Sequence, residues 1–299
     1  MNLNASPQVS VVIPTYNHAH YLARALQSVL DQSYTNWEVI VIDNHSADNT
    51  DEVLQSFTDP RISFLKIHNN GVIAASRNAG IRAAKGEWVA FLDSDDWWER
   101  NKLQVCFDSI DGKIDFVYHE LDLVRESPQL FGKKTIGSWQ VKPSVLVDLM
   151  VRGNAIPTSS VLVKKRLLDE IGGMNESADM VASEDYNAWL KIAGLTDRFL
   201  YVPKVLGSYT LHSQGVSKKD MSVSERHATN EFVSLLNERQ RMKFEANLKY
   251  KKGRFCYLAG DYSVAKENLL FVMRHGQSKF FLKSLYMVGA VYLNNKNMI

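Results

Sequence analysis

The stretch GEWVAFLDSDD, residues 86–96, decides the fold class of this 299-residue chain. Its apolar run over residues 88–92 is typical of a strand that is buried on both faces. Three carboxylates follow within four positions, at Asp93, Asp95 and Asp96. A solvated acidic turn would explain such a cluster in isolation. At the carboxyl end of a parallel strand, the same side chains suit Mg²⁺ or Mn²⁺, which prefer oxygen ligands and leave coordination positions for phosphates.

The residues that precede this stretch alternate between strand and helix patterns. Strands are predicted at residues 9–13, 38–42 and 62–67. A first helix is predicted where Leu22, Leu26, Val29 and Leu30 share one face, a second runs from a cap at Asp48 to about residue 57, and a third covers 74–85 and is ended by Gly86. This alternation predicts a mainly parallel sheet flanked by helices, an α/β fold. Ligands bind such sheets outside the carboxyl ends of the strands. Polar residues follow three of the predicted strands, at positions 15–17, 43–44 and 93–96.

The pattern changes in the second half of the chain. Strands are predicted at residues 159–163 and 199–202, a helix at 186–193, and helices throughout from about residue 222. Within residues 253–276, a helix, a Gly-Asp turn and a second helix resemble half of a tetratricopeptide repeat. The charge changes as well, because the chain has 20 basic and 26 acidic residues up to position 217 but 15 and 7 beyond it. We therefore predict an α/β domain over residues 1–217 and a basic helical region over 218–299.

Several classes of protein are excluded by what the sequence lacks. There is no GxGxxG, GxxxxGK[ST], HExxH or GxSxG motif, so a dinucleotide fold, a P-loop and two classes of hydrolase are not expected. The two cysteines, Cys106 and Cys256, form no CxxC pair and are expected to be buried thiols. No secretory signal and no apolar run of about 20 residues is found. We expect a cytoplasmic protein, free or peripheral on the inner face of the cell membrane, with no nucleic-acid partner.

Eight segments in order resemble family 2 glycosyltransferases, which have the GT-A fold. They are VSVVIPTYN (9–17), VIDNHSADNT (41–50), GVIAASRNAG (71–80), GEWVAFLDSDD (86–96), TSSVLVK (158–164), GGMNE (172–176), SEDYNAWL (183–190) and HSQGVS (212–217). Each segment is weak evidence alone, but their shared order is specific. The resemblance implies an inverting, metal-dependent enzyme that takes a sugar from a nucleoside-diphosphate sugar.

The resemblance also implies roles for residues on the nucleotide side. Pro14, Thr15 and Tyr16 would lie against the nucleoside, with Tyr16 near the base, and Asp43 and Asn44 would line the pocket for base and ribose. The family usually has two aspartates at the positions of Asp43 and Asn44. A carboxylate there only accepts a hydrogen bond from the base, whereas the amide of Asn44 both donates and accepts. The donor nucleotide is expected to be UDP, and the departure at Asn44 leaves dTDP and GDP as alternatives.

Further roles follow on the reactive side. Arg77 would lie near the nucleotide, Asp93 would contact the ribose or the donor sugar, Asp95 would bind Mg²⁺ or Mn²⁺, and His212 would close over the metal and the diphosphate. A structural role for His212 remains an alternative. Where the family often has Tyr-Arg-x-His, this chain has Thr210 before Leu211 and His212, so one cation on the diphosphate side is missing.

The pair Glu184-Asp185 is the predicted catalytic site, with Asp185 as the base. It would take the proton from an acceptor hydroxyl as that hydroxyl attacks the anomeric carbon. The alternative is that the pair only complements the positive end of a helix dipole. Two other functions stay open, a sugar-phosphate nucleotidyltransferase and a binding module without catalysis. The acceptor is expected to be a glycan or a lipid-linked glycan in bacterial surface polysaccharide synthesis.

The basic C-terminal region suggests a surface for partners. Lys249, Lys251, Lys252 and Arg254 lie near four aromatic residues, Phe244, Tyr250, Phe255 and Tyr257. Such a mixture suits an anionic membrane surface, to which each basic residue contributes about 1 kcal/mol. A solvated helix face is one alternative. A homodimer formed through the apolar positions 269, 270, 272, 280 and 281 is another.

Overall fold

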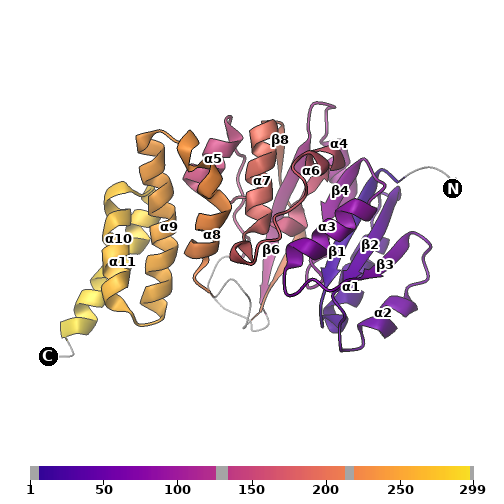
Figure 1. Ribbon diagram of the computed structural model, residues 1–299, viewed down its shortest axis with the longest axis horizontal. Helices are drawn as coiled ribbons and strands as arrows, with labels where there is room; N and C mark the ends of the chain where they lie inside the picture. The colour runs from indigo at the N-terminus through magenta and orange to yellow at the C-terminus, as the bar shows by residue number, and fades with distance from the viewer. Residues whose placement is uncertain (1–6, 126–133, 213–218, 297–299) are drawn as a thin grey trace.

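A mixed sheet forms the part of the protein from residue 9 to residue 211. The computed structural model describes residues 7–125, 134–212 and 219–296. Within these residues the sheet has eight strands in the order β3-β2-β1-β4-β7-β6-β8-β5 (Figure 1). The strands are β1 (Val9–Thr15), β2 (Trp37–Asp43), β3 (Ile62–Lys66), β4 (Trp88–Phe91), β5 (Trp97–Trp98), β6 (Phe116–Arg125), β7 (Leu162–Lys164) and β8 (Phe199–Leu211). The first four are parallel, whereas β7 is antiparallel to β4 and β6, and β5 is antiparallel to β8. The predicted fold class is confirmed.

Helices cover both faces of the sheet, which explains why the central strands are apolar on both sides. On one face, α1 (Ala19–Leu30) and α4 (Lys102–Asp108) pack against alternate residues of β1, including Val11 and Ile13. On the other face, Val12 packs with residues of α3 (Ile73–Ala83), α5 (Val145–Arg152), α6 (Lys165–Glu170) and α7 (Glu184–Leu195). The short helix α2 (Thr50–Ser56) follows β2.

Two predicted helix boundaries are corrected by the structure. Asn49, not Asp48, is the N-cap residue of α2. The Asp48 carboxylate accepts hydrogen bonds from the first turn of α2 and from the Ala19 N–H of α1, so it joins the starts of two helices. Helix α3 ends at Ala83, before Gly86. A Cβ at Gly86 would lie 2.7 Å from the Ser10 nitrogen, so glycine is needed there for close approach to β1 rather than to end a helix.

The second half of the chain was predicted less completely. Ser159 and Ser160, assigned to a strand, lie in a 3₁₀ turn (Thr158–Ser160), and β7 begins only at Leu162. The sequence pattern did not predict five further elements, namely strands β5 and β6 and helices α4, α5 and α6. Strand β8 extends nine residues beyond the predicted end, to Leu211.

The helical C-terminal region lies at the end of the molecule opposite the parallel strands (Figure 1). It consists of α8 (Met221–Thr229), α9 (Glu238–Leu258), α10 (Tyr262–His275) and α11 (Ser278–Lys296), with a 3₁₀ segment (Asn230–Leu235) after α8. The predicted helix-turn-helix is present, because Gly260 (φ +83°) separates α9 from α10. Phe244 and Leu248 of α9 join the hydrophobic core that contains Trp189 of α7. The division at residue 217 stays a prediction.

Two smaller predictions can be compared directly with the structure. Cys106 and Cys256 are free and buried, as expected. No helix in the described part of the chain is both long and apolar enough to cross a membrane.

Candidate active site

The carboxyl ends of β2, β1 and β4 bring three of the predicted polar clusters to one edge of the sheet. Thr15 pairs in register with Asp43, and Val12 pairs with Phe91, so Asp93 follows at the same level. This convergence is what the parallel order of the strands requires. The site is therefore built on the sheet edge, with residues of α3, α7 and β8 added from the second half of the chain.

The residues predicted to lie on the nucleotide side differ in solvent exposure. Pro14 and Thr15 are buried, whereas the Tyr16 side chain is 54% exposed. Asp43 is fully buried, and its carboxylate accepts hydrogen bonds from the Ser46 hydroxyl at 2.6 Å and from the Ser46 N–H at 3.0 Å. Asp43 therefore shapes the loop after β2. The residues left to contact a nucleotide base, as the sequence predicts, are Tyr16 after β1 and Asn44 after β2.

The Asn44 side chain has a fixed orientation, because its oxygen accepts the Asn69 N–H at 2.8 Å. Its amide NH₂ is then the group left for another partner, and an amide NH₂ only donates. Uracil, thymine and guanine all carry carbonyl oxygens that accept such a bond. The orientation therefore fits the three nucleotides expected from the sequence.

Asp95 and His212 come together although 117 residues separate them. The distance from Asp95 Oδ2 to His212 Nε2 is 2.7 Å, and the two side chains are 20% and 21% exposed. The other ring nitrogen, Nδ1, lies 3.3 Å from the Tyr21 hydroxyl. Across residues 7–125, 134–212 and 219–296, no three His, Cys, Asp or Glu side chains cluster as a metal site. A partly exposed carboxylate and imidazole in contact with each other fit a divalent cation whose other ligands are phosphates and water.

Asp96, which received no role from the sequence beyond the acidic cluster, connects three parts of the site. It is 1% exposed and accepts hydrogen bonds from the Ser159 hydroxyl at 2.6 Å and from the Thr210 N–H at 2.9 Å. Burial, together with the charges of Asp95 and Asp93, raises the pKa of Asp96 well above its ordinary value. Asp96 thereby joins the loop after β4 to the end of β8, two residues before His212.

Arg77 of α3 connects the nucleotide side with the predicted catalytic pair. Its guanidinium is buried and contacts Asp93 at 2.7 Å and Glu184 at 2.6 Å. Burial favours the neutral form, but the charges of Asp93 and Glu184 dominate and raise the pKa of Arg77. Arg77 is thus a permanent cation between two carboxylates, and Glu184 is engaged in this ion pair.

Asp185 at the start of α7 has the environment expected of a general base. Its Oδ2 accepts the Thr158 hydroxyl at 2.7 Å, and its Oδ1 accepts the Tyr186 N–H at 2.6 Å. Burial and the neighbouring charge of Glu184 raise the pKa of Asp185 to about 6. A carboxylate with this pKa is ionised at neutral pH yet is a better proton acceptor than an ordinary one.

Tyr209 lies among the carboxylates of the site and was missed by the sequence analysis. Its pKa is raised by burial and further by the charges of Asp96, Asp93, Asp95 and Asp185. The only sequence signal for Tyr209 was its place in the segment that ends at His212. Thr158 was likewise quoted in a motif without a role. His18 was also overlooked, and its ring contacts the loop after β4 through Ser94 at 2.9 Å.

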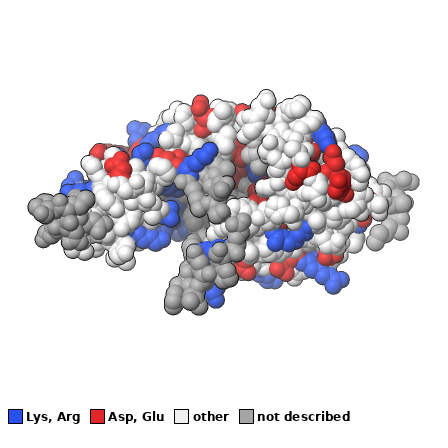
Figure 2. Space-filling model, turned by 90° about the horizontal axis from the view of Figure 1, so that it is seen from below, with Lys and Arg blue, Asp and Glu red and all other residues white. Residues whose placement is uncertain are grey.

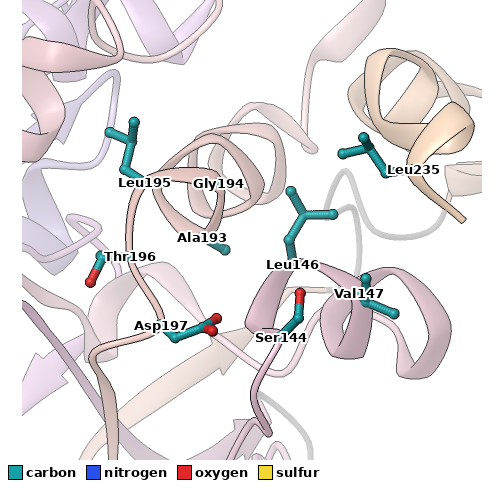
Figure 3. Close-up of a pocket in the computed structure, with 9 residues that line it drawn as sticks. All are labelled: Ser144, Leu146, Val147, Ala193, Gly194, Leu195, Thr196, Asp197 and Leu235. Carbon is teal, nitrogen blue, oxygen red and sulfur yellow. The ribbon is translucent and has the colours of Figure 1, made fainter.

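A cavity of about 490 Å³ lies elsewhere, at the other end of α7 (Figure 3). Figure 3 shows it between the start of α5, the end of α7 and Leu235. Its lining includes Leu146, Gly194 and Asp197, and Asp197 accepts the Val145 N–H at 2.7 Å. Gly194 is nine residues from Asp185, or about 14 Å along the helix axis. This cavity is separate from the candidate active site.

Comparison with known proteins identifies the class of protein. Residues 10–157 match the family described as "Glycosyl transferase family 2". The chain is 31% identical over 185 residues to UDP-Glc:alpha-D-GlcNAc-diphosphoundecaprenol beta-1,3-glucosyltransferase WfgD of Escherichia coli. The aligned residues make up 62% of this chain and 69% of that protein. The chain belongs to glycosyltransferase family 2 and is a glycosyltransferase, which decides against the nucleotidyltransferase and binding-module alternatives.

Solved structures share the fold at lower sequence identity. TarS 1–349 of S. aureus in complex with UDP-GlcNAc is 21% identical, with a TM-score of 0.63 over 95% of this chain and 89% of that one. The mannosyltransferase PcManGT from Pyrobaculum calidifontis, in complex with GDP-Man and Mn²⁺, is 19% identical, with a TM-score of 0.63 over 97% of this chain and 81% of that one. The likeness extends over the C-terminal helices as well as the sheet.

Proposed function

We propose that the protein is an inverting glycosyltransferase that moves a sugar from a nucleoside-diphosphate sugar, with UDP as the expected nucleotide, to a hydroxyl of a lipid-linked glycan. The observation that carries this proposal is the chain of contacts from Asp93 through Arg77 to Glu184, beside Asp185. It connects a sheet edge suited to a nucleotide with a carboxylate suited to remove a proton. The diphosphoundecaprenol in the name of the Escherichia coli relative supports the lipid-linked acceptor.

The reaction follows from the positions of these residues. Asp185 accepts the proton of the acceptor hydroxyl while the oxygen of that hydroxyl attacks the anomeric carbon. Thr158 and the Tyr186 N–H hold the two carboxylate oxygens, so the base is oriented before the acceptor arrives. The nucleoside diphosphate leaves from the opposite face, and this single displacement inverts the anomeric centre.

The departing diphosphate carries negative charge that the site must stabilise. Asp95 and His212 would hold Mg²⁺ or Mn²⁺, and such a cation neutralises the charge on the leaving phosphates. Asp96 and Tyr21 hold these two side chains in place. Asp96 binds the end of β8 beside His212, and the Tyr21 hydroxyl contacts the His212 imidazole. The Mn²⁺ in the Pyrobaculum calidifontis structure supports this assignment.

A donor screen tests the proposal. The melting temperature of the full-length protein is measured with UDP-, dTDP- and GDP-sugars, each with and without Mn²⁺, because a ligand that binds the native state stabilises it. Release of nucleoside diphosphate is then followed with the stabilising donor. We expect stabilisation by one nucleotide series and Mn²⁺-dependent release. Stabilisation by none of the donors, or release of pyrophosphate instead, would contradict the proposal.

Two of the four basic residues predicted to bind membrane are paired with carboxylates in the structure. Lys251 forms an ion pair with Glu225, and Lys252 pairs with Asp220 at 2.7 Å. Phe244 is buried. On the face that Figure 2 shows, basic and acidic side chains are interspersed over the C-terminal helices instead of forming one basic surface. The predicted dimer face is also wrong in part, because Leu269 and Val272 are fully buried.

Helix α11 offers a better surface for an anionic membrane. Its exposed large apolar side chains are Phe281, Leu282, Leu285, Tyr286, Tyr292 and Leu293. The helix has Lys279 and Lys283 near its start and no Asp or Glu over residues 278–296. Apolar side chains with lysines and no carboxylates suit the boundary between acyl chains and anionic headgroups. Attachment there would keep the enzyme next to a lipid-linked acceptor.

Vesicle co-sedimentation tests this attachment. The wild type and the double variant Leu282→Glu/Tyr286→Glu are compared on phosphatidylglycerol and phosphatidylcholine vesicles at low and high salt, with Leu258→Glu on the exposed end of α9 as control. We expect the wild type and the control to bind anionic vesicles at low salt and the double variant to lose most binding. Equal binding by all three would contradict the assignment. Loss of a dimer by the double variant in light scattering, without loss of binding, would instead identify α11 as a contact between copies.

A further inference from the structure

The loop between β1 and α1 places a second imidazole beside the candidate metal site. The His18 ring lies 6.1 Å from the His212 ring and 5.6 Å from the Tyr21 ring, measured between centroids. Its Nδ1 is hydrogen-bonded to the Ser94 hydroxyl at 2.9 Å, next to Asp95. His18 therefore lies beside the loop after β4, the strand next to β1 in the sheet.

The position of His18 leaves its side chain available for another role. His18 is the N-cap residue of α1, where a polar side chain commonly accepts an N–H of the first turn. Its side chain makes no such bond, and the Asp48 carboxylate accepts the Ala19 N–H in its place. Asp48 thus accepts an N–H at the start of α1 that the His18 side chain does not bind, so the imidazole can bind another group.

The contact with Ser94 occupies Nδ1 and leaves Nε2 as the ring nitrogen available to another partner. Ser94 is 3% exposed, and in the described part of the chain its hydroxyl has a hydrogen bond only with His18. If the hydroxyl donates to Nδ1, the hydrogen of the neutral ring is on Nε2. If the ring is protonated, Nε2 also carries a hydrogen. Nε2 is a donor in these two states, whereas it is an acceptor if the neutral ring donates from Nδ1 to the hydroxyl. Nε2 has no partner among the described residues, and an anionic acceptor selects the states in which it donates.

We infer that His18 Nε2 donates a hydrogen bond to the diphosphate of the donor, beside Asp95 and His212. This inference rests on the proposed function. His18 would supply from the β1–α1 loop part of the stabilisation that the motif at residues 209–212 lacks. Phosphate oxygens are strong acceptors, and hydrogen bonds to ionised groups are about twice as strong as neutral ones.

Nucleotide affinity measures this contact independently of turnover. Dissociation constants for UDP and UMP are determined by calorimetry in Mn²⁺ for full-length wild type, His18→Asn and His18→Gln. Asparagine keeps a polar atom near the Nδ1 position, and with it the contact to Ser94, but has nothing at Nε2. Glutamine places its amide nitrogen near the Nε2 position. His20→Asn is the matched control, because the exposed His20 ring lies against Tyr21, outside the loop after β4.

The expected result separates diphosphate from monophosphate. We expect His18→Asn to weaken UDP binding about tenfold and UMP binding less than twofold, as for loss of one charge-assisted hydrogen bond. His18→Gln should recover most of the affinity, and His20→Asn should bind like the wild type. Unchanged UDP affinity in His18→Asn, or equal losses for UDP and UMP, would overturn the inference alone. A wild type that binds no nucleoside diphosphate would instead reject the proposed function.

Discussion

The hydrogen bond from Thr158 to Asp185 should set the pH at which the enzyme loses activity. The Thr158 hydroxyl, 2.7 Å from Asp185 Oδ2, stabilises the ionised carboxylate and holds its pKa down against burial. A hydrogen bond to a charged group contributes about 1.5–3 kcal/mol, and one pKa unit corresponds to about 1.4 kcal/mol. Thr158→Val should therefore raise the pKa of Asp185 from about 6 by about one to two units.

The sign of the effect follows from the role of the base. A protonated Asp185 cannot accept the acceptor's proton, so activity falls as the pH drops through its pKa. The acid limb of kcat/KM should move to higher pH in Thr158→Val, and activity at pH 6.5 should fall about three- to 25-fold. Near pH 9 the variant should approach the wild type. Thr158→Ser, which keeps the hydroxyl, is the matched control. A folded Thr158→Val enzyme whose acid limb stays within about 0.3 pH units of the wild type would refute the reasoning.

Three further outcomes are expected. Asp95→Ala should abolish Mn²⁺-dependent transfer with an unchanged melting temperature, and near-normal turnover of this variant in excess EDTA would contradict a metal role. Asn44→Asp replaces the amide donor with an acceptor and should change the order of affinities for UDP, dTDP and GDP in calorimetry; an unchanged order would remove Asn44 from the base pocket. Gly86→Ala should lower the free energy of unfolding in urea by about 1–3 kcal/mol, because its Cβ would lie 2.7 Å from the Ser10 nitrogen. Gly194→Ala, whose Cβ would have its nearest neighbour at 3.8 Å, is the control and should not destabilise.

The parallel half of the fold was predictable because local patterns there agree with the tertiary structure. Strands β1, β2 and β4 are buried on both faces, so their apolar runs are continuous and end at polar residues. Strand β6 gave no such signal: its first six residues are buried, including His119 and Glu120, and the last four are not. Its identity depends on pairing with β7 and β8, which lie far away in the sequence.

The sequence predicted which residues belong to the site better than it predicted the contacts between them. The order of motifs placed Asp95, Asp185 and His212 at one site, and the structure brings Asp95 and His212 to within 2.7 Å. The ion pair between Arg77 and Glu184 joins residues 107 positions apart, and nothing in their local sequence indicates it. The burial of Asp43 was not predicted either, because it depends on the place of β2 between β1 and β3 in the sheet. The Ser46 hydroxyl then satisfies the buried carboxylate.

The role of Asp185 as the base is the central claim, and one comparison tests it most directly. Transfer by wild type and Asp185→Asn is measured at saturating donor, with the dissociation constant of the donor determined for both proteins. Asparagine has nearly the same shape but cannot accept the proton, so we expect turnover to fall by about 10²–10⁴ while donor affinity stays the same. Turnover that is unchanged in Asp185→Asn would show that another group removes the proton and would contradict the account.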